Sequence, residues 1–260
     1  MKRLIVCGLF LLLGVATLQA VPFIINKEVA QEKHSLWDSI VKGEPVRVLI
    51  NGPDMRELDP QYQVLVRSGM KRWFSDIARI IKESGRAEEF EDILPLLERG
   101  IQVEFQKRPE EFFSMVISVY DNMDRLLRVC QSTACATAVK TPGRLPGIMI
   151  FSLELAQEYE RKWDKTLTHE FGHLLGLLDQ YPYGVQTQTE LRLPESISTD
   201  IYPDASVMYN SQQEIGCDDV DGFINIIDLR RGGAQGQRQG MAWKSFCEAS
   251  PDYFKDGRRI

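Results

Sequence analysis

The residues with the clearest chemical potential lie in one short stretch, HEFGH at 169–173. Side chains four residues apart share one face of an α-helix, so His169 and His173 can hold one zinc ion from the same side. Zinc lowers the pKa of a bound water, and Glu170 can accept the proton that this water releases. The stretch therefore predicts a zinc-bound hydroxide, the nucleophile of a metal-assisted hydrolysis.

A pair of surface histidines on an ordinary structural helix is the other explanation of this stretch. Leu167, Phe171 and Leu174 supply the apolar face that any such helix needs to pack against a core. The spacing His-Glu-x-x-His also arises by chance, so the metal interpretation depends on the features that follow it.

A catalytic zinc site needs a third protein ligand and an open position for water. No histidine follows the motif, and the only other one, His34, lies far upstream, so we expect a carboxylate. Gly176 can adopt a positive φ and end the helix sharply, which brings Asp179 within reach of the metal. Glu190 or Glu195, carried by a later element, is the competing third ligand.

The extended motif resembles the signature of the metzincin proteases. Residues 169–181 read HEFGHLLGLLDQY, and ASVMY at 205–209 resembles the methionine turn that metzincins carry beneath the zinc. The usual third ligand of the group is His, and Asp179 stands in its place. This departure is similar to the snapalysin-type and immune inhibitor A-type proteases. The resemblance covers roughly residues 148–230.

The resemblance implies a secreted zinc endopeptidase with an α+β fold, in which helices back a mixed sheet and a small C-terminal subdomain follows the zinc helix. It implies three zinc ligands, His169, His173 and Asp179, and Glu170 as the general base. Met208 would pack beneath the metal without ligating it. The alternatives are a catalytically idle extracellular binding module with a structural zinc, and a zinc amidase acting on cell-wall peptides.

The resemblance also implies how a protein or peptide substrate would be held. The segment 133–140 would form the edge strand of the cleft, and the substrate would pair with it as an added strand. Tyr209 would either steady the oxyanion of the tetrahedral intermediate or serve as an ordinary core residue.

The N-terminal segment 21–43 offers a means of latency. A carboxylate from it, such as Glu28, Glu32 or Asp38, could cover the metal in a latent form.

The first 20 residues predict a secretory signal peptide. Lys2 and Arg3 precede a nearly continuous apolar run, and Ala20 offers a small residue at the cleavage position. The apolar run is short for a membrane span, so no membrane association is expected after cleavage. A retained signal anchor and a lipoprotein are the alternatives.

Four cysteines remain after the signal peptide, and an even number in an exported chain predicts two disulfides. Proximity favours the pairs Cys130–Cys135 and Cys217–Cys247. Four free thiols are the alternative.

The composition is that of an ordinary globular protein. The 260 residues are 43% hydrophobic and 26% charged, which excludes a disordered or collagen-like chain. The net charge is −6 with no cluster of Lys and Arg, so no nucleic-acid partner is expected. The oligomeric state is left open.

The periodicity of hydrophobic residues, together with the Gly and Pro residues that end helices and strands, predicts a lead-in over 21–43. One domain follows over 44–260, with a subdomain break near residue 176. We expect helices over 28–42, from Pro60 to just before Gly85, over 88–99, and up to Leu175. We expect strands over 46–50, 101–105, 113–120, 133–140 and 148–152.

A second metal-like stretch follows the methionine turn. The sequence CDDVDGFINIID at 217–228 resembles an EF-hand-type or dockerin-type calcium loop from its third position onward, although Cys217 occupies the acidic first position. The alternative is a helix whose first turn carries acidic caps, where metzincins place their C-terminal helix.

Overall fold

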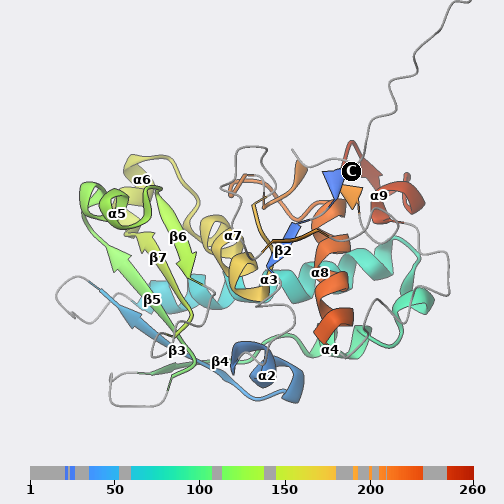
Figure 1. The fold of residues 1–260 in the computed structure, drawn as a ribbon, viewed down its shortest axis with the longest axis horizontal. Coiled ribbons are helices and arrows are strands. Elements are labelled where there is room, and N and C mark those ends of the chain that lie inside the picture. The colour runs from blue at the N-terminus through green and yellow to red at the C-terminus, as the bar shows by residue number, and fades with distance from the viewer. Residues whose placement is uncertain are drawn as a thin grey trace, which may run out of the picture.

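The structure is a computed structural model. It describes residues 21–22, 24–26, 35–52, 60–106, 113–137, 145–179, 190–192, 199–200, 205–208, 210–230 and 245–260. The fold is α+β, with helices around a five-stranded, mainly parallel sheet (Figure 1).

The sheet has the strand order β4-β3-β5-β7-β6. Strands β4, β3, β5 and β7 run parallel, and β6 pairs antiparallel with β7 at the edge. Alternate side chains of β5 are buried, as expected where successive residues point to opposite faces. The five strands are β3 (Val46–Asn51), β4 (Val103–Gln106), β5 (Met115–Tyr120), β6 (Ala134–Thr137) and β7 (Gly147–Phe151).

Two helices carry most of the packing around the motif. The long helix α3 (Pro60–Glu83) packs against α7 (Trp163–Leu175), and α7 in turn contacts β6 and β7. In Figure 1, α7 stands between β6 and α8 (Cys217–Arg230), and α3 runs across below them. The remaining helices are α2 (Ser35–Lys42), the 3-10 helix η2 (Ala87–Phe90), α4 (Leu94–Arg99), α5 (Met123–Cys130), α6 (Leu153–Glu158) and α9 (Phe246–Ala249).

An aromatic cluster packs α2, α3 and α8 into one core. The ring of Phe223 on α8 stacks on Trp73 at 5.6 Å between centroids and meets the edge of Phe74 at 5.4 Å. Trp37 of α2 approaches the same ring at 6.1 Å. All four side chains are fully buried, so the helix of the lead-in segment packs into the same core as the C-terminal helix.

The N-terminal segment differs from the expectation of a polar lead-in with a single helix. Its residues form β1 (Val21–Pro22) and β2 (Ile24–Asn26), which pair antiparallel with β9 (Thr199–Asp200) and β8 (Glu190–Arg192). These pairings join segments far apart in sequence, which local patterning does not reveal. The helix expected over 28–42 is described only from Ser35 onward.

One expected helix differs from the structure, and two helices were not predicted. The helix expected over 88–99 is divided into η2 and α4, with turns between them. Helices α5 and α6 were not predicted, because each is too short to show a full apolar period. Both begin at a side-chain cap: Asn122 accepts a hydrogen bond from Arg125 N at 3.0 Å, and Ser152 accepts one from Leu155 N at 3.3 Å.

The cysteines pair as expected. The Cα atoms of Cys130 and Cys135 lie 5.6 Å apart, and those of Cys217 and Cys247 lie 5.1 Å apart, and both pairs form disulfides. The second bridge joins α8 to α9, ahead of a short hairpin of β10 (Phe254–Lys255) and β11 (Arg258–Arg259). Among the described residues, no helix combines the length and apolar character that crossing a membrane requires.

Candidate metal centre

Helix α7 ends where the sequence predicts. Gly176 has φ = 113°, and its N–H bonds to the carbonyl oxygens of Gly172 and His173, both at 3.1 Å. This left-handed cap satisfies carbonyls that the helix end would leave without partners. The chain then turns back toward the helix, which positions Asp179 beside the two histidines.

Three buried tryptophans fix the position of α7 through hydrogen bonds to backbone carbonyls. Trp163 Nε1 donates to Phe151 O at 2.8 Å at the start of the helix. Trp73 Nε1, from α3, donates to Thr168 O at 2.8 Å, next to the motif. Trp37 Nε1, from α2, donates to Leu175 O at 2.9 Å, in the last turn. The helix is thus held at both ends and in the middle.

The carboxylate oxygen of Asp179 lies close to Nε2 of both expected histidine ligands. Asp179 Oδ1 lies 3.3 Å from His169 Nε2 and 3.4 Å from His173 Nε2. Ligand atoms that surround a tetrahedral zinc at 2.0–2.2 Å lie about 3.3–3.5 Å from one another. The two nitrogens and the carboxylate oxygen therefore have the chemistry and the spacing of a three-ligand zinc site.

The other ring nitrogen of each histidine has a backbone partner. His169 Nδ1 lies 2.8 Å from Val207 O, and His173 Nδ1 lies 2.9 Å from Leu177 O. A carbonyl oxygen can only accept, so both Nδ1 atoms carry the proton. Each Nε2 then carries a lone pair and lies near the Asp179 oxygen, the arrangement that metal-binding histidines use.

Glu170 is buried next to the two histidines, with 5% of its surface exposed. Burial raises the pKa of its carboxyl above the ordinary value, and the Asp179 charge adds to this, against the opposing effect of the histidines. A carboxylate whose pKa is raised accepts a proton more readily, which suits a general base.

His173 and Asp179 form a strongly coupled pair in the metal-free protein. Burial alone would lower the pKa of His173, but the hydrogen bond and negative charge of Asp179 raise it to about 9. Burial opposes ionisation of Asp179, but the two histidines lower the pKa of this carboxyl below its ordinary value. A proton on His173 thus occupies the place that a metal ion would take.

Met208 packs against α7 at Gly172, which lies between His169 and His173 in the sequence. It is fully buried, and a Cβ atom on Gly172 would lie 2.6 Å from Met208 Sδ and 2.8 Å from the ring of Trp73. The approach is closer than a methyl group allows, which explains glycine at this position of the motif. The placement of Met208 fits a residue that packs against α7.

A buried carboxylate on α8 holds the turn that carries Met208. Asp219 accepts hydrogen bonds from Ser206 Oγ at 2.5 Å, Val207 N at 2.9 Å and Gly216 N at 2.8 Å. In the sequence, Asp219 is part of the stretch considered as a calcium loop or as the acidic first turn of a helix. Its signal was an acid three residues after Gly216, where a side chain bonds back to the start of its own helix.

The stretch considered as a calcium loop forms helix α8 and not a loop. Asp221 is also buried there, and both of its carboxylate oxygens accept from Phe246 N, at 3.0 and 3.1 Å. These carboxylates are engaged with backbone N–H groups, which fits the alternative of an acid-capped helix.

The remaining sequence candidates lie elsewhere. Asp38 faces Arg230 at 3.4 Å and not the histidines. Glu190 is the first residue of β8. Glu28, Glu32, His34, Glu195 and Tyr209 lie outside the described residues.

No family model matches the chain, and no curated protein matches it at a significant level. The functional inference therefore depends on the residues of this site and their geometry.

Proposed function

We propose that the protein is a secreted zinc endopeptidase of metzincin type. One observation carries the proposal: Asp179 Oδ1 lies 3.3 and 3.4 Å from the two histidine Nε2 atoms, the spacing of ligands around one zinc. The buried carboxyl of Glu170 beside these donors adds the base that hydrolysis needs.

His169, His173 and Asp179 would hold the zinc, which when bound polarises a water molecule and the substrate carbonyl. Glu170 takes the proton of this water at its carboxylate and later gives it to the nitrogen of the leaving amine. Val207 O and Leu177 O keep the imidazole rings oriented through Nδ1 during both steps.

Strand β6 supports the assignment of a peptide as substrate. It is the last strand of the sheet and contacts α7, so its outer edge runs beside the helix that carries the histidines. An extended peptide can add to such an edge through main-chain hydrogen bonds. Strand β6 (Ala134–Thr137) lies within the segment 133–140, which the metzincin resemblance implies as the edge that pairs with substrate.

A catalytically idle module with a structural zinc has less support. A structural site needs four protein ligands and no base, whereas this site brings together three donors and a buried glutamate.

The direct test is hydrolysis of casein by the wild type, with and without a chelator, and by Glu170→Gln. The amide is nearly isosteric but cannot take the proton of the water, so the variant should keep zinc and lose activity by several orders of magnitude. Glu158→Gln, an exposed residue on α6, is the matched control and should behave as the wild type. Casein hydrolysis by Glu170→Gln near the wild-type rate would overturn the proposal.

A further inference from the structure

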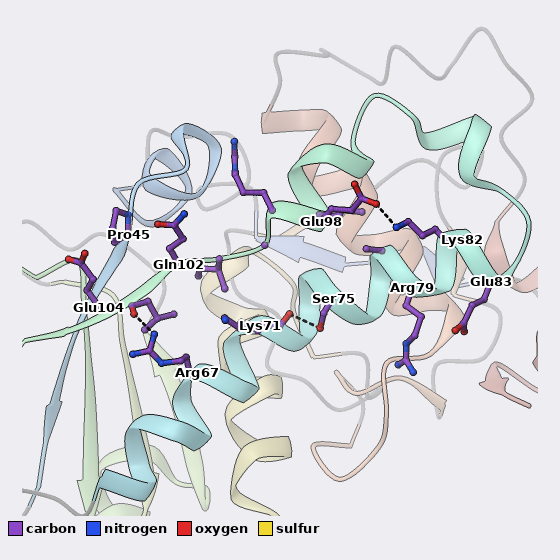
Figure 2. Close-up of a pocket in the computed structure, with 16 residues that line it drawn as sticks. Pro45, Arg67, Lys71, Ser75, Arg79, Lys82, Glu83, Glu98, Gln102 and Glu104 are labelled. Atoms are coloured by element: carbon purple, nitrogen blue, oxygen red, sulfur yellow. Dashed lines mark hydrogen bonds and ion pairs between the residues drawn. The ribbon is translucent and has the colours of Figure 1, made fainter.

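A trough runs along the face of α3 that points away from the metal centre (Figure 2). Its volume is about 910 Å³, and α3, the end of α4 and the start of β4 line it. Gly69 of α3 meets Leu167 of α7, and Lys71, two residues later, lies about 200° further round the helix. The trough is therefore separate from the site of the histidines.

A hydrogen bond and an ion pair between α3 and the opposite wall mark the two ends of the trough. At one end Arg67 Nη1 donates to Val103 O at 2.7 Å, and at the other Lys82 forms an ion pair with Glu98. Figure 2 shows Lys71 and Ser75 between these links. The distance from Arg67 to Lys82 along the helix is about 22 Å, which accommodates six to seven residues of extended peptide.

The far wall of the trough is an open sheet edge. Strand β4 is the last strand on its side of the described sheet and pairs only with β3 there. Gln102 O accepts from Val46 N at 2.8 Å, so the next residue, Val103, directs its carbonyl and its N–H away from β3. Arg67 binds this carbonyl. The Val103 N–H points to the same side and can donate to an incoming chain.

The charges of the lining leave an excess of cations. Two of its three acids are paired with a cation: Glu98 with Lys82, and Glu104 with Arg47 at 3.5 Å. Glu83 accepts a hydrogen bond from the neutral Tyr253 hydroxyl at 2.5 Å and keeps its charge.

The cations with no carboxylate partner among the described residues are Arg67, Lys71 and Arg99. Arg67 and Arg99 donate to backbone carbonyls, which leaves their charge uncompensated. This excess stands out in a chain whose net charge is −6.

We propose that the trough binds an extended, acidic segment of a protein substrate, remote from the bond to be cleaved. A main-chain carbonyl of the segment would accept the N–H of Val103, whose own carbonyl is already bound by Arg67, and the carboxylates of the segment would meet Lys71 and Arg67. The position of this N–H on an edge strand favours an extended peptide over a sulfated glycan, because a peptide can run along the strand. The assignment rests on the proposed function only in naming a substrate as the source of the segment.

The test measures binding without catalysis. The probe is a fluorescein-labelled ten-residue peptide of alternating Glu and Thr, titrated into full-length Glu170→Gln protein and followed by anisotropy. We expect saturable binding that weakens as salt rises, because the contacts are charged and accessible. Lys71→Glu in the same protein should weaken it about tenfold, since an attraction becomes a repulsion.

Four controls make the result specific. Lys71→Arg keeps the charge and should keep the affinity. Arg161→Glu reverses the charge of an exposed residue outside the trough and should leave the affinity unchanged. The matching Gln/Thr peptide should bind much more weakly. N-methylation of alternate amides in the acidic peptide should also reduce its affinity, because the methyl groups obstruct the approach of its main chain to the edge of β4.

Equal affinity of the Lys71→Glu and Arg161→Glu proteins for the acidic peptide would overturn the proposal. Tighter binding of a heparin-derived oligosaccharide than of the peptide, lost in Lys71→Glu, would overturn it in favour of a glycan site. Hydrolysis of a short neutral peptide by Lys71→Glu should equal that of the wild type. If the wild type hydrolyses no peptide while the acidic peptide still binds in the trough, only the proposed function is contradicted.

Discussion

The carboxylate of Asp219 accepts a hydrogen bond from the backbone N–H of Val207 over 2.9 Å. The carbonyl of Val207 lies 2.8 Å from Nδ1 of His169. A carboxylate on α8 thus orients an imidazole on α7 with one residue between them. The same carboxylate bonds to Ser206 and Gly216, so it fixes the whole turn beneath the donor atoms.

Replacing Asp219 by Asn should weaken both the fold and the metal site. The amide nitrogen would face an N–H donor in a fully buried site, which costs about 2 kcal/mol in the free energy of unfolding. Burial already raises the pKa of Asp219 to about 6, which offsets part of the stabilisation by its three hydrogen bonds. Zinc affinity should fall about tenfold, as for other outer-shell changes.

Urea unfolding and competition with a chromophoric chelator measure the two effects of Asp219→Asn. Ser206→Ala is the comparison, because it removes the bond from Ser206 Oγ to Asp219 and the bond from Met208 N to Ser206 Oγ, but keeps both backbone N–H donors to the Asp219 carboxylate. It should cost about 1–2 kcal/mol in the free energy of unfolding and lower zinc affinity less than Asp219→Asn does. An Asp219→Asn protein with wild-type zinc affinity would show that the turn does not orient His169.

Gly172→Ala should destabilise the protein although alanine favours a helix. The new methyl group would lie 2.6 Å from Met208 Sδ and 2.8 Å from Trp73. Overpacking costs about 1–3 kcal/mol, which outweighs the helix gain of about 1 kcal/mol. In urea unfolding, the double variant with Met208→Ala should lose less than the sum of the two single changes. Strictly additive losses would mean that Met208 does not press on Gly172.

The sequence predicts the metal helix and its end well, because local rules determine them. The apolar face of residues 163–175 and the stop at Gly176 depend only on neighbours in the chain, and the structure has both. The five strands of the sheet overlap the five stretches that the sequence predicts as strands. The pairing of residues 21–26 with 190–200 depends on contacts between distant segments, and the sequence shows no sign of it.

The supports of the site were harder to predict than its donors. Trp37 and Trp73 look like core residues in the sequence, and their hydrogen bonds to α7 depend on how three helices pack. The basic lining of the trough is also hidden, because Arg67 and Lys71 are one helical turn apart and do not form a run of charge.

Zinc affinity should rise with pH until about pH 9. In the metal-free protein the pKa of His173 is raised to about 9, so at neutral pH this ring carries a proton that zinc must displace. The logarithm of the affinity should therefore rise by about one per pH unit and flatten above pH 9. Calorimetry in buffers of different ionisation enthalpy should detect about one proton released at pH 7.

The stability of the metal-free protein should show the opposite trend over this range. Because the folded pKa of His173 lies above its unfolded value, its contribution is complete below about pH 6.5 and is lost as the pH rises through about 9. Asp179, whose pKa is lowered, contributes above about pH 3.8 and loses this contribution as the pH falls further.

For the zinc titration, an affinity that does not change between pH 6 and pH 9 would contradict the interaction of His173 with Asp179.

The two disulfides should contribute unequally to stability. Cys217 and Cys247 are 30 positions apart, whereas Cys130 and Cys135 are separated by 5, so the first bridge closes the longer loop. Loop entropy gives about 3.7 kcal/mol for the long loop and about 2.2 kcal/mol for the short one. Paired Cys→Ala variants compared by denaturant unfolding measure this order. A larger loss on removing the Cys130–Cys135 bridge would contradict it.

Asp179→Asn provides the sharpest test of the third ligand. The amide keeps the size of the side chain but removes its charge, so zinc affinity should fall by more than about 100-fold, beyond the range of outer-shell changes. In the metal-free variant the pKa of His173 should fall, because burial then acts without the opposing carboxylate. With three histidines in the chain, proton NMR can follow each titration. Glu190→Gln is the control and should keep both zinc and the histidine pKa values. If Asp179→Asn stays fully loaded while Glu190→Gln loses its zinc, Asp179 is not the ligand, and the metzincin proposal fails with it.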